Sequence, residues 1–333
     1  MLPVEIIGTG VYVPGEAIDN EELMALADVE FDSEKLENKL GIYRRHIARL
    51  RGIQETTADF ATRAGLNAIE AAGIDPEQIG LFIVGTDTPE FITPATSILV
   101  QGRIQKGEKW SSTFDVSASC ASFTIALDNA ARIMATDPSI EYGLVIGVYN
   151  MPAFIRENDA FGISIFADGA GAVVLKRNPE SRYITGQLLT DGTQWDFIGI
   201  YAGGSRNPIT PELIKEEKQG LLSLQPLPGD RNVRLWPMVV KKLLQKAQMD
   251  ISQIDHFVFT QINRSVIEKV LDELQQPYSK ASFVMDRYGY TGSGCVPMAF
   301  HNAVKEGKVN KGDTVLFMAS GAGLAVGSNL FVY

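Results

Sequence analysis

The chain of 333 residues contains only two cysteines and three histidines. No Cys/His cluster surrounds either cysteine, which argues against a zinc site or a disulfide framework, and we expect no bound metal. The longest apolar runs, such as Leu144–Val148, fall far short of the roughly 20 residues of a membrane span. A formal net charge of −10 gives no support for nucleic-acid binding. The opening MLPVEIIGTG lacks the features of a secretory signal, so we expect a cytoplasmic protein.

The sequence is instead rich in short apolar runs that alternate with helical patterns. Apolar residues make up 45% of the chain, which suffices for a large α/β core. The patterns predict strands at 4–12, 81–84, 113–116, 142–148, 256–260 and 315–318, and helices at 20–27, 33–40, 57–72, 95–103, 234–249 and 265–275. Ile163–Lys176 is interpreted as two strands joined by a glycine turn.

The second half of the chain repeats the first. Gly73–Gly85 (GIDPEQIGLFIVG) aligns with Gln248–Thr260 (QMDISQIDHFVFT) at an offset of 250 − 75 = 175 residues. The same offset carries Cys120 onto Cys295, and the late strand near Val315 matches the one near Leu144. Three matches in the same order indicate an internal duplication.

The duplication predicts a layered architecture. Two β-α-β-α-β copies would pack sheet beside sheet with helices on the outer faces. The helices that follow Cys120 and Cys295 would then lie back to back in the centre. We expect two halves, residues 1–178 and 179–333, whose equivalent loops meet at one pocket.

Cys120 lies where a β-prone run, Thr113–Val116, meets a helical pattern. The free N–H groups of a helix start favour a thiolate over a thiol. The small residues Ala118, Ser119, Ala121 and Ser122 would let a bulky substrate approach the sulfur. Taken alone, the cysteine is better interpreted as a small buried apolar residue.

Eight stretches, taken in order, resemble the thiolase-like condensing enzymes, and among them the β-ketoacyl-acyl carrier protein synthase III branch. They are IIGTGVYVP (6–14), GIYRRHIA (41–48), FDVSASCASF (114–123), FADGAGAVVL (166–175), GGSR (203–206), TQIN (260–263), GYTGSGCVP (289–297) and SGAGLAVGS (320–328). The resemblance covers essentially the whole chain. It implies a five-layered α-β-α-β-α fold with two mixed sheets around central helices, and a role in fatty acid or polyketide biosynthesis.

The resemblance also implies the chemistry. Cys120 would take an acyl group from coenzyme A or acyl carrier protein, and a malonyl-derived carbon nucleophile would then receive it. The N–H groups of Cys120 and Ala322 would form the oxyanion hole. The substrates would be phosphopantetheine thioesters, with no permanently bound cofactor.

Two positions depart from the family pattern. The family's catalytic His and Asn are replaced here by Thr260 and Tyr290. Both residues carry hydroxyl donors, but neither is a base near pH 7. The loss of this acid–base group argues against an ordinary decarboxylative condensation.

No other residue obviously replaces the missing histidine. His46, His256 and His301 are interpreted as surface residues or residues satisfied in the packing. Thiolases proper use a second cysteine as an acid–base group, so a Cys120/Cys295 pair is conceivable. The branch matched here has a small residue at that position, and we favour a packing role for Cys295.

Other positions concern the acyl and pantetheine groups. Thr93 falls where the family reaches across a homodimer into the partner's acyl pocket, and its small size predicts medium, long or branched acyl chains. Asn263 is expected to hold the pantetheine arm, and Arg156 to contact adenine or phosphate. Lys39 replaces an expected Arg in the nucleotide site, and Lys35 an expected Trp. An acyl carrier protein could instead dock on a basic patch made of Lys35, Lys39, Arg44, Arg45 and Arg264.

Three readings of function remain open. The favoured one is an acyl-Cys120 acyltransferase or condensing enzyme of unusual type. An ordinary initiation enzyme of fatty-acid synthesis fits Thr260 and Tyr290 poorly. A half-active or non-catalytic subunit of a heteromeric condensing enzyme is the alternative.

Overall fold

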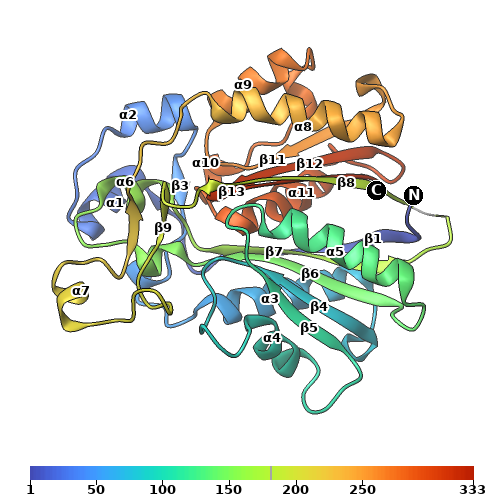
Figure 1. Cartoon of the computed structure of the whole chain (residues 1–333), viewed down its shortest axis with the longest axis horizontal. Coiled ribbons are helices and arrows are strands. Elements are labelled where there is room, and N and C mark those ends of the chain that lie inside the picture. The colour runs from blue at the N-terminus through green and yellow to red at the C-terminus, as the bar shows by residue number, and fades with distance from the viewer. Residues whose placement is uncertain (181) are drawn as a thin grey trace.

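The computed structural model describes residues 1–180 and 182–333 as two stacked β-sheets with helices between and outside them (Figure 1). One sheet has the order β1-β7-β6-β4-β5. Its strands are β1 (Val4–Tyr12), β7 (Gly169–Arg177), β6 (Tyr142–Tyr149), β4 (Ile79–Gly85) and β5 (Ser112–Val116). The other has the order β11-β12-β13-β8. Its strands are β11 (His256–Phe259), β12 (Thr314–Gly321), β13 (Gly323–Val332) and β8 (Tyr183–Gln194).

Helices occupy three layers around these sheets. The first sheet is covered on its outer face by α3 (Thr57–Ala72) and α4 (Thr96–Ile104), and the second by α8 (Arg231–Ala247) and α9 (Arg264–Glu273) (Figure 1). Between the sheets lie α5 (Ser122–Thr136) and α11 (Cys295–Lys305). The predicted five-layered α-β-α-β-α fold with two mixed sheets is therefore confirmed.

The predicted duplication is visible in the strand pairing. In the first sheet β4 is parallel to β6, and β6 is antiparallel to β7. In the second, β11 is parallel to β12, and β12 is antiparallel to β13. The turns before β4 and β11 carry the same capping box, formed by Asp75 and Gln78 in one copy and by Asp250 and Gln253 in the other. The division at residue 178 falls in the connection from β7 to β8 and stays a prediction.

The remaining elements gather mostly at one end of the layered body, on the left of Figure 1. They are β2 (Ile18–Asp19), α1 (Asn20–Ala27), α2 (Ser33–Lys35), β3 (Arg44–Arg45), α6 (Ala160–Ile165), β9 (Ile198–Ile200), α7 (Pro211–Lys215), β10 (Leu221–Ser223) and α10 (Met285–Tyr288). Within the described residues, no helix combines the length and apolar character that crossing a bilayer requires.

One predicted element is wrong. Residues 163–165 belong to α6 rather than to a strand, because the Asp159 side chain accepts a hydrogen bond from the Gly162 N–H and starts a helix there. The helix expected at 33–40 is present over that range, as a short α2 that continues into a π-helical turn, Leu36–Leu40. Gly41 ends that turn at a φ of 76°, a left-handed conformation that favours glycine.

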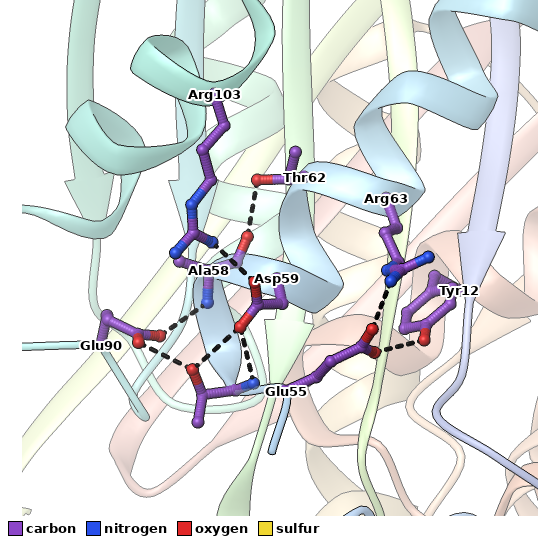
Figure 2. Close-up of polar contacts among 9 residues, drawn as sticks. Tyr12, Glu55, Ala58, Asp59, Thr62, Arg63, Glu90 and Arg103 are labelled. Carbon is purple, nitrogen blue, oxygen red and sulfur yellow. Dashed lines mark hydrogen bonds and ion pairs between the residues drawn. The ribbon is translucent and has the colours of Figure 1, made fainter. Parts of the chain in front are cut away.

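Hydrogen bonds attach the loop between β4 and α4 to the start of α3. The carboxylate of Glu90 accepts hydrogen bonds from the Ala58 N–H (2.8 Å) and from the Thr56 hydroxyl (2.7 Å), so that it caps the helix (Figure 2). Asp59 of the same turn pairs with Arg103 of α4 at 3.3 Å (Figure 2). The loop that leads from β4 towards Thr93 is thereby held in place at its middle.

Candidate functional site

Cys120 lies on a tight turn between β5 and α5. The Ser122 hydroxyl accepts a hydrogen bond from the Ala118 N–H (2.9 Å) and donates one to the Ser119 carbonyl (2.5 Å). Ser119 itself has a φ of 49°, a left-handed conformation that non-glycine residues seldom adopt. The turn therefore fixes Cys120 just ahead of the first residue of α5, with its side chain 8% exposed.

The sulfur faces a cavity of about 610 Å³ that both halves of the chain line. Five of the predicted site residues line it: Cys120, Thr260, Asn263, Tyr290 and Ala322. They come from the β5–α5 turn, the end of β11, the start of α9, the segment before α11 and the β12–β13 turn. Residues up to 202 positions apart (322 − 120) thus meet at one place, as equivalent loops of a duplicated fold should.

Gly321 brings the β12–β13 turn against Cys120. A β-carbon at this position would lie 2.5 Å from the Ala118 carbonyl oxygen and 2.7 Å from the Cys120 nitrogen, closer than real contacts allow. Only glycine permits this approach. It sets the next residue, Ala322, in the cavity wall beside Cys120.

The Cys120 thiol is less acidic than the sequence suggested. Burial, and after it the charge of Asp87, raises the pKa of this thiol to about 12, whereas contacts with the Tyr290 and Ser119 hydroxyls lower it. The preference for a thiolate that was expected from the helix start is therefore opposed by burial. The N-terminus of a helix offers a nearby anion about 0.3–1 kcal/mol, which burial outweighs here.

Thr260 and Tyr290 supply hydroxyl groups to the same cavity. The Thr260 oxygen accepts a hydrogen bond from the Ser320 N–H at 3.2 Å, which leaves its own proton to donate. The Tyr290 ring packs against Tyr149 and Phe166, and burial raises the pKa of its phenol well above 10. Both groups are therefore donors at neutral pH, and neither accepts a proton readily.

No histidine is among the described residues that line this cavity. Each has a partner elsewhere: His46 Nδ1 contacts the Gly15 carbonyl oxygen at 3.0 Å, His256 Nε2 the Ser282 hydroxyl at 2.8 Å, and His301 Nδ1 the Thr9 hydroxyl at 2.9 Å. Burial lowers the pKa of all three imidazoles, that of His256 to about 4. They are held in the packing, as expected.

Cys295 begins α11 and is fully buried. Its sulfur accepts a hydrogen bond from the Gln261 N–H at 3.4 Å, and burial raises the pKa of its thiol. It is not among the residues that line the cavity. The second cysteine thus fits a packing role better than an acid–base role.

A second hollow of about 430 Å³ adjoins the cavity and shares Leu40, Phe161, Ile165 and Asn263 with it. Lys35 and Lys39 lie in its wall, and both are exposed. The Asn263 side chain also accepts a hydrogen bond from the Val266 N–H and so caps α9. The shared residues indicate that the cavity reaches the surface beside these two lysines.

Three expected contact residues lie elsewhere. Thr93 is exposed on the loop before α4, and Arg156 is half-buried with Asp159 at 3.8 Å; neither lines the two hollows. Arg45 is fully buried and donates to Asn20 Oδ1 (2.5 Å) and the Ser164 carbonyl oxygen (2.9 Å). Its place in a surface basic patch is therefore a wrong prediction, while Arg44 and Arg264 are exposed.

Two charged residues of the cavity were missed. Asp87 follows β4, and Arg231 begins α8 and donates a hydrogen bond to Gln194 Oε1 at 3.2 Å. A signal for Asp87 existed, because it follows the carboxyl end of a parallel strand, beside the strand that leads to Cys120. Nothing in the local sequence marked Arg231.

Comparisons with known proteins agree with this geometry. The family models described as 3-oxoacyl-[acyl-carrier-protein] synthase III and as its C-terminal part match residues 114–192 and 244–333. Proteins named β-ketoacyl-[acyl-carrier-protein] synthase III from Xanthomonas campestris and Clostridium acetobutylicum are each 32% identical to this chain, and 98% of both chains is covered. A crystal structure of 3-oxoacyl-[acyl-carrier-protein] synthase III from Aquifex aeolicus matches with a TM-score of 0.86 at 29% identity, covering 99% of this chain and 100% of that one.

Proposed function

The chain belongs to the 3-oxoacyl-[acyl-carrier-protein] synthase III family of thiolase-like condensing enzymes, and on this premise we propose that it carries an acyl group on Cys120. The acyl donor is a thioester of coenzyme A or acyl carrier protein, and the acyl group passes to a second substrate. The observation that carries the proposal is the single cavity in which Cys120 meets Thr260, Tyr290 and Ala322.

The proposed first step is thioester exchange. The Cys120 sulfur attacks the thioester carbonyl, the Sγ–C bond forms, and the bond to the pantetheine sulfur breaks. The N–H groups of Cys120 and Ala322 hold the oxyanion that forms in between. Thr260 and Tyr290 donate hydrogen bonds within the cavity, and a malonyl-type thioester or another nucleophile then takes the acyl group.

The pantetheine arm enters through the second hollow. Asn263 lines both this hollow and the cavity, so it is placed to contact the arm along its path. Lys35 and Lys39 at the mouth favour an acidic carrier protein or the phosphates of coenzyme A. Arg156 lines neither hollow, and its proposed contact with adenine or phosphate would lie outside them.

The acyl chain is proposed to be medium, long or branched, in a homodimer. Thr93 is exposed on a single chain, as a residue that reaches into a partner's pocket would be. Acylation with acetyl- and decanoyl-coenzyme A compares the two classes of donor. A strict preference for acetyl would contradict this assignment.

Intact-protein mass spectrometry after mixing with acyl-coenzyme A or acyl-acyl carrier protein tests the proposal. We expect a mass increase equal to the acyl group, which Cys120→Ala abolishes. Release of carbon dioxide from a malonyl thioester then separates condensation from plain transfer. Absence of any adduct with either donor would overturn the proposal in favour of a non-catalytic subunit of a heteromeric enzyme.

A further inference from the structure

The cavity wall holds one carboxyl group among the described residues that line it, and the chemistry above gives it no role. Asp87 lies there together with Ser119, Cys120 and Tyr149. Its Oδ1 is buried and has no hydrogen-bond partner in the part of the chain that the structure describes. An unpaired buried acceptor costs about 1–3 kcal/mol, so a carboxyl kept in this position calls for an explanation.

The backbone on both sides of Asp87 is fixed. The Thr86 N–H donates to the Val116 carbonyl at 3.0 Å, and the Thr88 N–H donates to the Thr86 hydroxyl at 3.1 Å. The Thr57 hydroxyl of α3 donates a hydrogen bond to the Thr88 carbonyl at 2.7 Å. The neighbouring Ala58 N–H donates to Glu90 (Figure 2). The carboxyl is therefore presented to the cavity by a rigid segment.

Ser119 lies between this carboxyl and the nucleophile. Its hydroxyl oxygen is 3.7 Å from the Cys120 sulfur. The same hydroxyl lies beside the Asp87 carboxyl and stabilises its ionised form. One hydroxyl group, which can accept one proton while it donates another, is thus placed in the same cavity wall as the thiol and the carboxyl.

We propose that Asp87 accepts the Cys120 proton through the Ser119 hydroxyl when the sulfur attacks the thioester. The thiol proton moves to the Ser119 oxygen, and the Ser119 proton moves to the Asp87 carboxylate. When the bond to pantetheine breaks, the departing thiolate takes a proton back along the same path. Ser119 and Asp87 thus end the step in their starting protonation states, Cys120 is acylated, and its former proton leaves on the pantetheine thiol. The assignment rests on the proposed acyl-Cys120 chemistry.

The charged and titratable groups around Asp87 are consistent with this role. Burial raises the pKa of Asp87 to about 6, so the carboxylate is ionised at neutral pH yet basic enough to accept a proton. Cys120, Tyr149 and Tyr290 are neutral there, because burial raises the pKa of each. Arg231 is the cation of the cavity. Among the described residues that line the cavity, Asp87 is therefore the group that changes charge between pH 5 and 8.

Rapid-quench mass spectrometry of Cys120 acylation between pH 5 and 9 tests the relay. The wild-type rate should fall as the pH drops through about 6, where Asp87 takes up its proton. Asp87→Asn and Ser119→Ala should each slow acylation by about 10²–10⁴-fold and remove this inflection. Together they should be no slower than either alone, because both interrupt one path. Asp230→Asn, which removes a negative charge at an exposed position outside the cavity, should keep the wild-type profile.

The direction of the effect separates a proton acceptor from a bystander. A carboxylate that only repels the thiolate would, when removed, speed the reaction of Cys120. Unchanged or faster acylation in Asp87→Asn would therefore overturn the proposal. Alkylation of Cys120 by iodoacetamide gives the same comparison without any acyl transfer, with Cys120→Ala as the background. If the wild type forms no acyl adduct, the proposed function fails. The relay is then judged by alkylation alone. Slower alkylation of Cys120 in Asp87→Asn than in the wild type supports it, and equal or faster alkylation refutes it.

Discussion

A β-carbon placed on Gly321 would lie 2.7 Å from the backbone nitrogen of Cys120. The two halves of the duplicated fold therefore touch at Cys120. The turn after β12 can line the cavity beside Cys120 only while residue 321 has no side chain.

Gly321→Ala should displace this turn from Cys120 and disrupt the proposed oxyanion hole. We expect Cys120 acylation to slow by about 10²–10³-fold, the usual effect of losing one oxyanion donor. Gly102→Ala is the matched control, because a β-carbon at Gly102 in α4 meets open space. It should acylate at the wild-type rate and gain about 0.5–1 kcal/mol of stability. Wild-type acylation by Gly321→Ala would contradict the account of this turn.

Asp87→Asn should stabilise the fold at high pH although it slows the reaction. Folding raises the pKa of Asp87 from 3.8 to about 6, so this group favours the folded state below pH 4 and loses that contribution as the pH rises through 6. At pH 8 the variant should be more stable by about 1–3 kcal/mol, with a smaller difference at pH 4.5. Urea unfolding at both pH values measures this. A variant less stable than the wild type at pH 8 would show that the carboxylate is a structural anchor.

Tyr290→Phe removes one hydroxyl and keeps the ring that packs on Tyr149 and Phe166. Since contact with this hydroxyl lowers the pKa of Cys120, that pKa should rise further in the variant. We expect acylation about 10- to 100-fold slower, as a hydrogen bond to a charged group is worth about 1.5–3 kcal/mol. Tyr288→Phe removes a tyrosine hydroxyl that does not line the cavity, so Cys120 should be acylated at the wild-type rate in this variant. Equal rates for the two variants would remove Tyr290 from the mechanism.

The edge strand β5 predicts where a second copy binds. It is hydrogen-bonded to β4 on one side only, and Trp110 just before it is 105% exposed. Ile92 on the Thr93 loop is 80% exposed. Light scattering should give a mass twice the 36.4 kDa of one chain. Trp110→Asp or Ile92→Asp should each raise the dissociation constant of the dimer by more than about tenfold. Met238→Asp, on the distant α8, should leave the mass unchanged; a monomeric wild type would refute the predicted homodimer.

Much of the fold could be predicted because it depends on local pattern. The bounds of α1 and α3 match the predicted ranges 20–27 and 57–72, and the 175-residue repeat predicted which strands correspond. The acidity of Cys120 and the burial of Arg45 could not be predicted, because both depend on how segments far apart in the sequence pack. Asp87 was missed for a related reason: its importance comes from Ser119 and Cys120, which lie more than 30 residues away in the chain.

Peptide mapping of the acylated protein tests the central claim most directly. After a short incubation with an isotope-labelled acyl thioester of coenzyme A or acyl carrier protein, the chain is quenched in acid and digested. The account predicts that the label resides on the peptide with Cys120 and that neutral hydroxylamine releases it, as a thioester requires. Label on the peptide with Cys295, or no label on Cys120 with either donor, would contradict it.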